Sequence, residues 1–351
     1  MNWEENVRRV VPYVPGEQPK DTNVIKLNTN ENPYPPAPGV EKLKQEFSCD
    51  RLRLYPDPEA TVLVDAIAKR YGVNPAQVFV GVGSDDVLAM AFLTFFNGEK
   101  PILFPDITYS FYDVWADLYR IPYKTCPLDE NFRMNIRDYE QENGGIIFPN
   151  PNAPTGVLET VENIETIVKN NPDVVVIVDE AYIDFGGTSV LPLVEKYENL
   201  LVVQTFSKSR SMAGMRIGFA LGSKKLISYM NDVKFSFNSY TMDWFTQILG
   251  AEAVRDEAYF KECTDKIVEV REWTKEELKK LQFTFEDSKA NFIFARHATL
   301  SGETIFKALK KRKIFVRHWN KERISDYLRI TIGTKEQMQE LIDALKEITQ
   351  M

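Results

Sequence analysis

Short apolar runs alternate along the chain with longer segments whose apolar residues recur every three or four positions. The first pattern predicts strands and the second predicts amphipathic helices. Between about residues 39 and 235 the two alternate regularly, which is typical of βαβ units. Residues 174–178 form an uninterrupted β-branched run, as expected for a strand covered on both faces. We therefore predict a large α/β domain over residues 39–235, with helices on both faces of a mostly parallel central sheet.

The two ends of the chain follow other patterns. Residues 1–38 are rich in Pro, Asn and Gly, which favours extended or turn structure, and we expect an arm that crosses a surface. Residues 236–351 begin with long charged helical segments, continue with three apolar runs and close with a helix from Lys335. This order predicts a smaller α+β domain, and 351 residues are enough for two domains.

Composition narrows the possible functions. The net charge of −8, with 43 basic and 51 acidic residues, argues against a nucleic-acid-binding face. No run approaches the ~20 apolar residues of a membrane span, and the first residues lack the apolar segment of a signal peptide, so we expect a cytoplasmic protein. Three widely spaced cysteines and two histidines offer little for a disulfide framework, a metal site or a histidine-based triad. Lysine and carboxylate chemistry is the remaining expectation.

Polar segments follow four of the predicted strands. In open α/β sheets, ligands bind beyond the carboxyl ends of the strands, so we expect these segments to meet at one crevice. The segments are GSDD (83–86), PNAPTG (151–156), DEAY (179–182) and TFSKS (205–209).

The first of these segments is suited to an anion. Gly83 permits close approach of the backbone, and Ser84 and Asp85 begin a helix whose free N–H groups and dipole favour a phosphate. The alternative is that Ser84 or Asp85 only caps the helix.

A carboxylate at the end of a buried strand requires a cationic partner, and Asp179 is in that position. The partner could be Mg²⁺, but the chain has no G-x-x-x-x-G-K-[ST] motif. It could also be the protonated ring nitrogen of pyridoxal phosphate (PLP), or a neighbouring arginine. Lys208 follows the next strand. It could form a Schiff base if Arg216 and a phosphate site lower the pKa of its amine or desolvate it, or it could simply be a solvated surface lysine.

Four motifs, NPNAPTG, VDEAY, TFSKSRSMAGMRIGF and LRITIGT, resemble those of the fold type I PLP-dependent aminotransferases. The resemblance runs from about Tyr13 to Gly333, and LNTNENP and YPD narrow it to the histidinol-phosphate aminotransferases and their close relatives. It implies a homodimer with PLP as cofactor that transfers an amino group between L-histidinol phosphate and 2-oxoglutarate. During histidine biosynthesis the transfer would run from glutamate to imidazole acetol phosphate.

Other functions stay open at this point. An aromatic amino-acid aminotransferase or a threonine-phosphate decarboxylase would share the fold and the cofactor. A non-catalytic PLP-binding regulator would be expected to carry an added helix-turn-helix region. A nucleotide-binding protein would use Asp179 and Glu180 as metal ligands.

The resemblance also implies a role for each matching residue. Lys208 would bind the cofactor's aldehyde carbon and shuttle the 1,3-proton, Asp179 would pair with the ring nitrogen, and Tyr182 would donate to the ring O3′. The remaining cofactor contacts would come from Tyr109 on the ring face and, at the phosphate, from Ser84, Asp85, Ser207, Arg216 and the neighbouring subunit's Tyr55. The substrate would be held by Tyr13, Asn30, Arg317 and Arg329.

One position departs from the family pattern. The family commonly reads PNNPTG, and the asparagine before the proline contacts O3′, whereas this chain has Ala153 there. We expect Asn152 to substitute; the alternative is that Tyr182 is the sole donor. For the two arginines, the alternatives are a solvated surface charge for Arg317 and a structural ion pair for Arg329.

Overall fold

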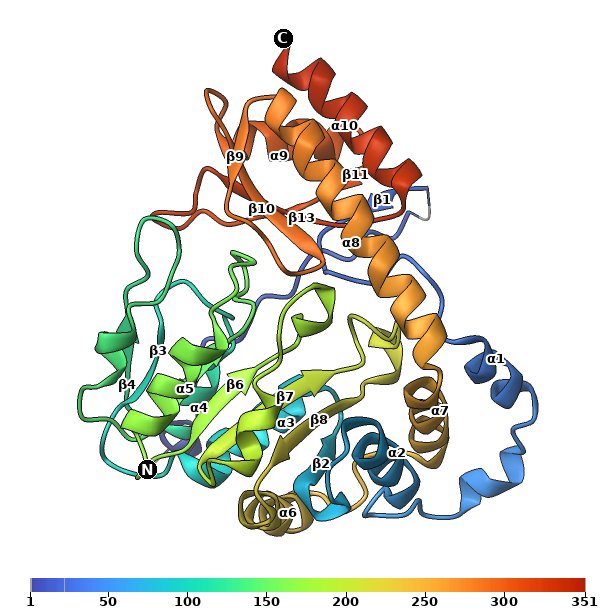
Figure 1. The fold of residues 1–351 in the computed structure, drawn as a ribbon, viewed down its shortest axis with the longest axis vertical. Helices are drawn as coiled ribbons and strands as arrows, with labels where there is room; N and C mark the ends of the chain where they lie inside the picture. Colours follow the sequence, from blue (N-terminus) through green and yellow to red (C-terminus); the bar gives the residue numbers. More distant parts are fainter. Residues whose placement is uncertain (1, 22, 351) are drawn as a thin grey trace.

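The structure is a computed structural model that describes residues 2–21 and 23–350, and its largest element is a seven-stranded sheet (Figure 1). The strand order is β2-β8-β7-β6-β5-β3-β4, and every neighbouring pair is parallel except the two that involve β8. The predicted mostly parallel sheet is therefore confirmed. The strands span Val78–Gly81 (β2), Ile102–Pro105 (β3), Tyr123–Cys126 (β4), Ile146–Pro149 (β5), Val176–Asp179 (β6), Leu200–Thr205 (β7) and Gly218–Gly222 (β8).

Helices cover both faces of this sheet, and β6 shows why its sequence is apolar throughout. Ile177 packs with α3, α4 and α6, whereas Val176 and Val178 pack with α5 on the other face. Successive side chains of a strand point to opposite faces, so both kinds of position must be apolar here. The helices of this part span Pro38–Gln45 (α1), Thr61–Tyr71 (α2), Ser84–Phe95 (α3), Tyr112–Tyr119 (α4), Val161–Asn170 (α5), Lys224–Phe237 (α6) and Trp244–Arg255 (α7).

A second, four-stranded antiparallel sheet has the order β12-β13-β10-β9 and packs against α8, α9 and α10. The long helix α8 extends from the large sheet to this smaller one (Figure 1). Within the described residues, no helix is both long and apolar enough to cross a membrane. The elements span Glu257–Lys280 (α8), Phe283–Phe285 (β9), Phe292–His297 (β10), Gly302–Lys311 (α9), Arg317–His318 (β12), Tyr327–Thr331 (β13) and Lys335–Thr349 (α10).

The division of the chain into 1–38, 39–235 and 236–351 stays a prediction. Residue 235 lies inside α6, and α7 beyond it packs against α2 in a core cluster of the large sheet. We therefore propose that the second domain begins with α8, later in the chain than the sequence suggested.

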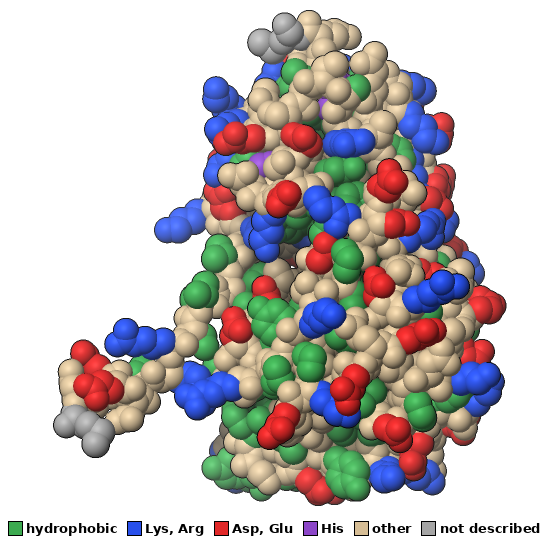
Figure 2. Space-filling model, turned by 90° about the vertical axis from the view of Figure 1, so that its left-hand side faces the viewer, with side chains coloured by type: hydrophobic (Ala, Val, Ile, Leu, Met, Phe, Trp, Pro, Cys, Tyr) green, Lys and Arg blue, Asp and Glu red, His purple; other side chains and the backbone are tan. Residues whose placement is uncertain are grey.

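The N-terminal segment connects the two sheets. Residues Trp3–Asn6 have no buried side chain and stand away from the rest of the molecule in Figure 2. Further along, β1 (Ile25–Lys26) pairs in parallel with β11 (Ile314–Phe315) of the smaller part. The segment between them passes the pocket described next, so it can contribute to the pocket wall.

Candidate active site

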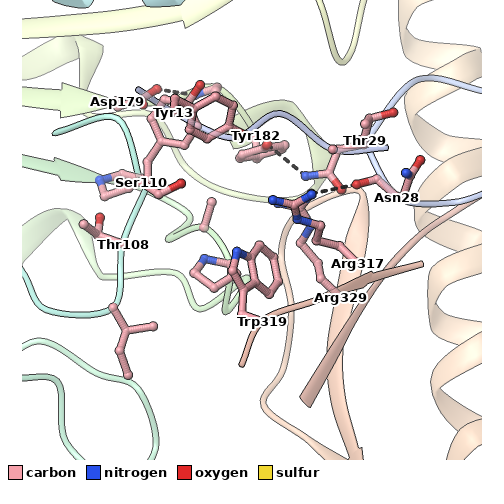
Figure 3. A pocket seen from close by; sticks show the side chains of 18 of the residues that line it. Tyr13, Asn28, Thr29, Thr108, Ser110, Asp179, Tyr182, Arg317, Trp319 and Arg329 are labelled. Atoms are coloured by element: carbon pink, nitrogen blue, oxygen red, sulfur yellow. Dashed lines mark hydrogen bonds between the residues drawn. The ribbon is translucent and has the colours of Figure 1, made fainter. Parts of the chain in front are cut away.

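A cavity of about 420 Å³ lies between the N-terminal segment, the strand ends of the large sheet and the smaller sheet (Figure 3). Its wall brings together predicted site residues that are far apart in the sequence. Those that line it are Tyr13, Asn30, Ser84, Asp85, Tyr109, Asp179, Tyr182, Ser207, Lys208, Arg216, Arg317 and Arg329. The convergence expected from the strand ends is thus present.

One end of the cavity is suited to an anion. The helix α3 begins at Ser84, its N-cap is Gly83 with φ 87°, and no side chain caps it, so the capping alternative is wrong. The free N–H groups of its first turn carry the positive end of the helix dipole. Arg216 lies beside them and forms an ion pair with Asp85 at 3.2 Å, and Ser207 also lines the cavity.

The buried carboxyl group of Asp179 lies deeper in the cavity. It accepts hydrogen bonds from the Tyr112 hydroxyl at 3.1 Å and from the Ala181 N–H at 3.2 Å. Burial raises the pKa of Asp179 to about 7, although these two hydrogen bonds act in the opposite direction. Among the ion pairs of the described residues none involves Asp179, so the arginine alternative is not supported.

The metal alternative is not supported either. The Glu180 carboxylate accepts bonds from Ser189 Oγ, the Val190 N–H and Gln204 Nε2, outside the cavity wall. In residues 2–21 and 23–350 no group of three or more acidic, His or Cys side chains is arranged to hold a metal ion.

Lys208 lines the cavity, near Tyr182. Its Nζ donates to the Thr29 carbonyl at 3.2 Å and lies 5.8 Å from the Tyr182 ring centroid. The Tyr182 hydroxyl accepts a bond from Asn30 Nδ2 at 2.9 Å, which leaves its own hydrogen available for donation. The Tyr109 hydroxyl donates to Asp85 at 2.8 Å, which fixes that ring in the wall.

Two arginines without carboxylate partners form the other end of the cavity. Arg329 donates to the Asn28 carbonyl at 3.0 Å, and its Nε has no hydrogen-bond partner among the described residues. Arg317 donates to the Val14 and Pro15 carbonyls at 3.2 and 3.4 Å. Burial lowers the pKa of Arg329 from its ordinary value. Because no carboxylate of the described chain neutralises either cation, the structural-pair alternative for Arg329 is wrong and an anionic ligand is favoured.

This arrangement fits PLP. A buried carboxyl group lacks a cation, a lysine lies nearby, and the uncapped end of α3 offers N–H groups to a phosphate. Glycine suits position 83 because its φ of 87° is a backbone conformation that L side chains rarely adopt, and a Cβ there would also displace the Arg216 guanidinium.

Two predicted residues are not brought into this cavity. Asn152 Nδ2 donates to the Ile107 carbonyl and to Thr155 Oγ1, both at 3.0 Å, so its N–H groups face away and Ala153 lines the wall instead. Tyr55 is 82% exposed, and its ring packs in a tilted arrangement against that of Tyr240, with centroids 4.7 Å apart. A role for Tyr55 therefore requires a second subunit.

Several lining residues were not predicted. Thr29 belongs to the LNTNENP motif, so the motif itself was a signal for it. Trp319 follows Arg317 by two positions, the spacing that places side chains on one face of a strand. Tyr112, which contacts Asp179 but does not itself line the cavity, gave no signal, since this contact depends on how α4 packs against the sheet.

Comparisons with known proteins agree with this geometry. The family model for class I and II aminotransferases matches residues 22–345. The chain is 54% identical to a histidinol-phosphate aminotransferase of Lactococcus lactis subsp. cremoris (strain MG1363), over 99% of this chain and 98% of the relative. It is 51% identical to that of Clostridium botulinum (strain Okra / Type B1), with the same coverage.

Solved structures share the fold. The histidinol-phosphate aminotransferase from Clostridium acetobutylicum superimposes with a TM-score of 0.86 at 22% identity, over 93% of this chain and 99% of that one. The enzyme from Sinorhizobium meliloti, solved in complex with pyridoxal-5'-phosphate, gives 0.85 at 21% identity, over 93% and 91%.

Proposed function

This chain belongs to the class I and II aminotransferase family, and from that premise we propose that it transfers an amino group between L-histidinol phosphate and 2-oxoglutarate with PLP as cofactor. In histidine biosynthesis the reaction runs from glutamate to imidazole acetol phosphate. The observation that carries this proposal is that one cavity holds Lys208 and Asp179 near the uncapped end of α3 and, at its other end, two arginines that have no carboxylate partner among the described residues. Relatives more than half identical over their full length support it.

When bound, PLP supplies an electron sink for the bond that is broken at the amino-bearing carbon. We propose that Asp179 holds the ring nitrogen in its protonated form and that the first N–H groups of α3 hold the phosphate. Ser207 and Arg216 would add charge-assisted hydrogen bonds, and Tyr109 would pack on the ring face. The Asp85–Arg216 ion pair then positions Arg216 for the phosphate.

Lys208 is the proposed acid and base. Its Nζ would take a proton from the amino-bearing carbon of the substrate and return it to the cofactor. Thr29 and Tyr182 lie beside the Lys208 side chain. The Tyr182 hydroxyl would donate its hydrogen to the ring O3′, because its oxygen already accepts a hydrogen bond from Asn30. With the amide of Asn152 turned away, we propose Tyr182 as the sole donor at this position.

Arg317 and Arg329 would bind the acidic group of each substrate in turn. A guanidinium can hold either a phosphate or a carboxylate through two parallel hydrogen bonds, so one pair of arginines suits both the phosphate ester and glutamate. Tyr13 and Asn30 would complete the wall from the N-terminal side.

We further propose a cytoplasmic homodimer in which Tyr55 reaches the cofactor phosphate of the partner subunit. Support comes from exposed apolar side chains around Tyr55, which a second copy would cover. They are Leu52, Leu54, Phe237 and Tyr240, between 47% and 69% exposed.

The test is a single half-reaction followed by absorbance. The PLP-loaded protein should lose the visible absorbance of its lysine-bound cofactor when histidinol phosphate is added, and should regain it with 2-oxoglutarate. If only phenylalanine or tyrosine caused the loss, the enzyme would be an aromatic amino-acid aminotransferase. Carbon dioxide release from threonine phosphate would identify a decarboxylase instead.

A further inference from the structure

Trp319 is a half-buried aromatic residue of the cavity wall to which the reaction described above gives no task. Its ring lies beside both substrate arginines, since the guanidinium carbons of Arg329 and Arg317 are 5.2 and 5.4 Å from the ring centroid. Figure 3 shows the indole between these arginines on one side and Thr108 and Ser110 on the other. The ring therefore borders the space next to the proposed anion site.

The indole is supported from behind by other aromatic rings. Phe294, which is 2% exposed, meets it edge to face with centroids 6.4 Å apart, and Tyr327 stacks on Phe294 at 4.6 Å. A ring fixed in this way loses little conformational freedom when a ligand packs against it. Trp319 is thus a preorganised aromatic surface rather than a mobile side chain.

We propose that Trp319 selects the substrate by its aromatic ring. A ligand with an anionic group on Arg329 and Arg317, joined by a short chain to a flat ring, would place that ring against the indole. Aromatic rings attract one another in offset or edge-to-face arrangements. The two neighbouring guanidinium charges would favour a neutral imidazole over an imidazolium. This inference rests on the proposed function and assigns the imidazole end of the phosphate ester.

Glutamate provides an internal reference for this proposal. It uses the same arginines and the same lysine, but it has no ring to pack on Trp319. A residue that only held the arginines in place would affect both half-reactions equally, whereas a ring-recognition residue affects the aromatic substrate selectively.

The experiment measures the two half-reactions separately in PLP-loaded Trp319→Leu and Trp319→Phe. For Trp319→Leu, kcat/KM with histidinol phosphate should fall roughly tenfold more than kcat/KM with glutamate, mainly through KM. Trp319→Phe should restore most of the difference, because it keeps an aromatic face. Trp273→Leu is the matched control: that indole also packs on a cation, with Lys335 Nζ 3.0 Å from its centroid, but it lies on α8 outside the cavity.

The outcomes separate this proposal from the proposed function. If Trp319→Leu lowered kcat/KM equally for histidinol phosphate and glutamate, or left the ratio of these two values unchanged, the role of Trp319 would be overturned. Failure of the wild-type enzyme to react with histidinol phosphate would instead overturn the proposed function. In that case phenylalanine serves as the aromatic amino donor. The ratio of kcat/KM for phenylalanine to kcat/KM for glutamate, compared between wild type and Trp319→Leu, still decides whether the indole recognises a ring.

Discussion

The Tyr112 hydroxyl donates a hydrogen bond to the Asp179 carboxyl group at 3.1 Å, and both side chains are buried. Burial raises the pKa of Asp179 to about 7, and the nearby Asp85 acts in the same direction. The bond from Tyr112 and the charge of Lys208 oppose this rise without replacing a direct cation. A ligand with a protonated ring nitrogen would supply that cation and favour the ionised carboxylate.

The first prediction concerns the cofactor-free protein. Since the folded pKa of Asp179 lies above the unfolded value of about 4, its ionisation lowers the free energy of unfolding as the pH rises from about 4 to about 7. Asp179→Asn should remove this loss and make the cofactor-free protein more stable by about 2 to 4 kcal/mol at about pH 8. Denaturant titrations at about pH 5 and pH 8 measure the difference.

Glu180 does not confound that comparison. Its pKa is also raised to about 7 by burial, but it is present in both proteins and its contribution cancels. A variant that is less stable than the wild type at the higher pH would contradict the prediction. PLP should bind the variant more weakly, because the partner of the ring nitrogen is gone.

Lys208→Ala should reduce turnover by roughly 10³-fold or more, because both the covalent attachment point and the acid–base group are lost. Borohydride treatment followed by mass spectrometry should label the wild type and leave the variant unlabelled. The exposed Lys224 provides the control, and Lys224→Ala should keep both turnover and labelling. Substantial turnover in Lys208→Ala would reject the assignment.

Gly83→Ala should weaken PLP binding roughly tenfold or more, because the new Cβ displaces the Arg216 guanidinium from the phosphate site. Gly72→Ala is a control at a second glycine with positive φ: Gly72 has φ +69° and ψ 28°, in the left-handed region, whereas Gly83 has φ +87° and ψ 163°, and no atom lies within 4 Å of a Cβ at position 72. The control should lose stability, by about 1 kcal/mol, with an unchanged dissociation constant for PLP. Equal affinities for both variants would argue against the phosphate site.

Arg323 fixes the loop after Trp319 to the large sheet. It forms an ion pair with Asp106 at 2.8 Å and donates to the Leu128 and Asp129 carbonyls at 2.7 and 2.9 Å. Arg323→Ala should raise KM for both substrates roughly three- to tenfold with little change in kcat, because the loop forms part of the wall. Arg323→Lys should be intermediate, since it keeps the charge without the planar fork. Steady-state kinetics decide, and unchanged KM values would show that the loop is held by other contacts.

Tyr55 can be tested by complementation between subunits. In a mixed dimer of Lys208→Ala and Tyr55→Ala chains, one site combines an intact Lys208 with the partner subunit's Tyr55 from the other chain. If Tyr55 acts across the interface, mixing the two impaired variants should restore activity above that of either alone. Absence of any gain in verified mixed dimers would contradict the proposed contact.

From the sequence alone, patterning predicted the sheet and the strand-end segments of the cavity wall, and the family resemblance added the other residues. Runs such as residues 174–178 predict strands covered on both faces, and parallel strands bring their carboxyl ends to one edge. Asp179 and Lys208, which follow neighbouring strands, were therefore expected to lie near the start of α3. Local patterning and chain direction are enough for such a prediction.

Only the tertiary structure decided which way the loop side chains point and which distant segments touch. Asn152 was expected in the cavity, but its amide binds the Ile107 carbonyl, and Ala153 lines the wall. The contacts of Tyr112 with Asp179 and of Trp319 with Arg329 join segments far apart in the chain. A single bond rotation redirects a loop side chain, and such rotations are fixed by packing between segments, which no local sequence pattern records.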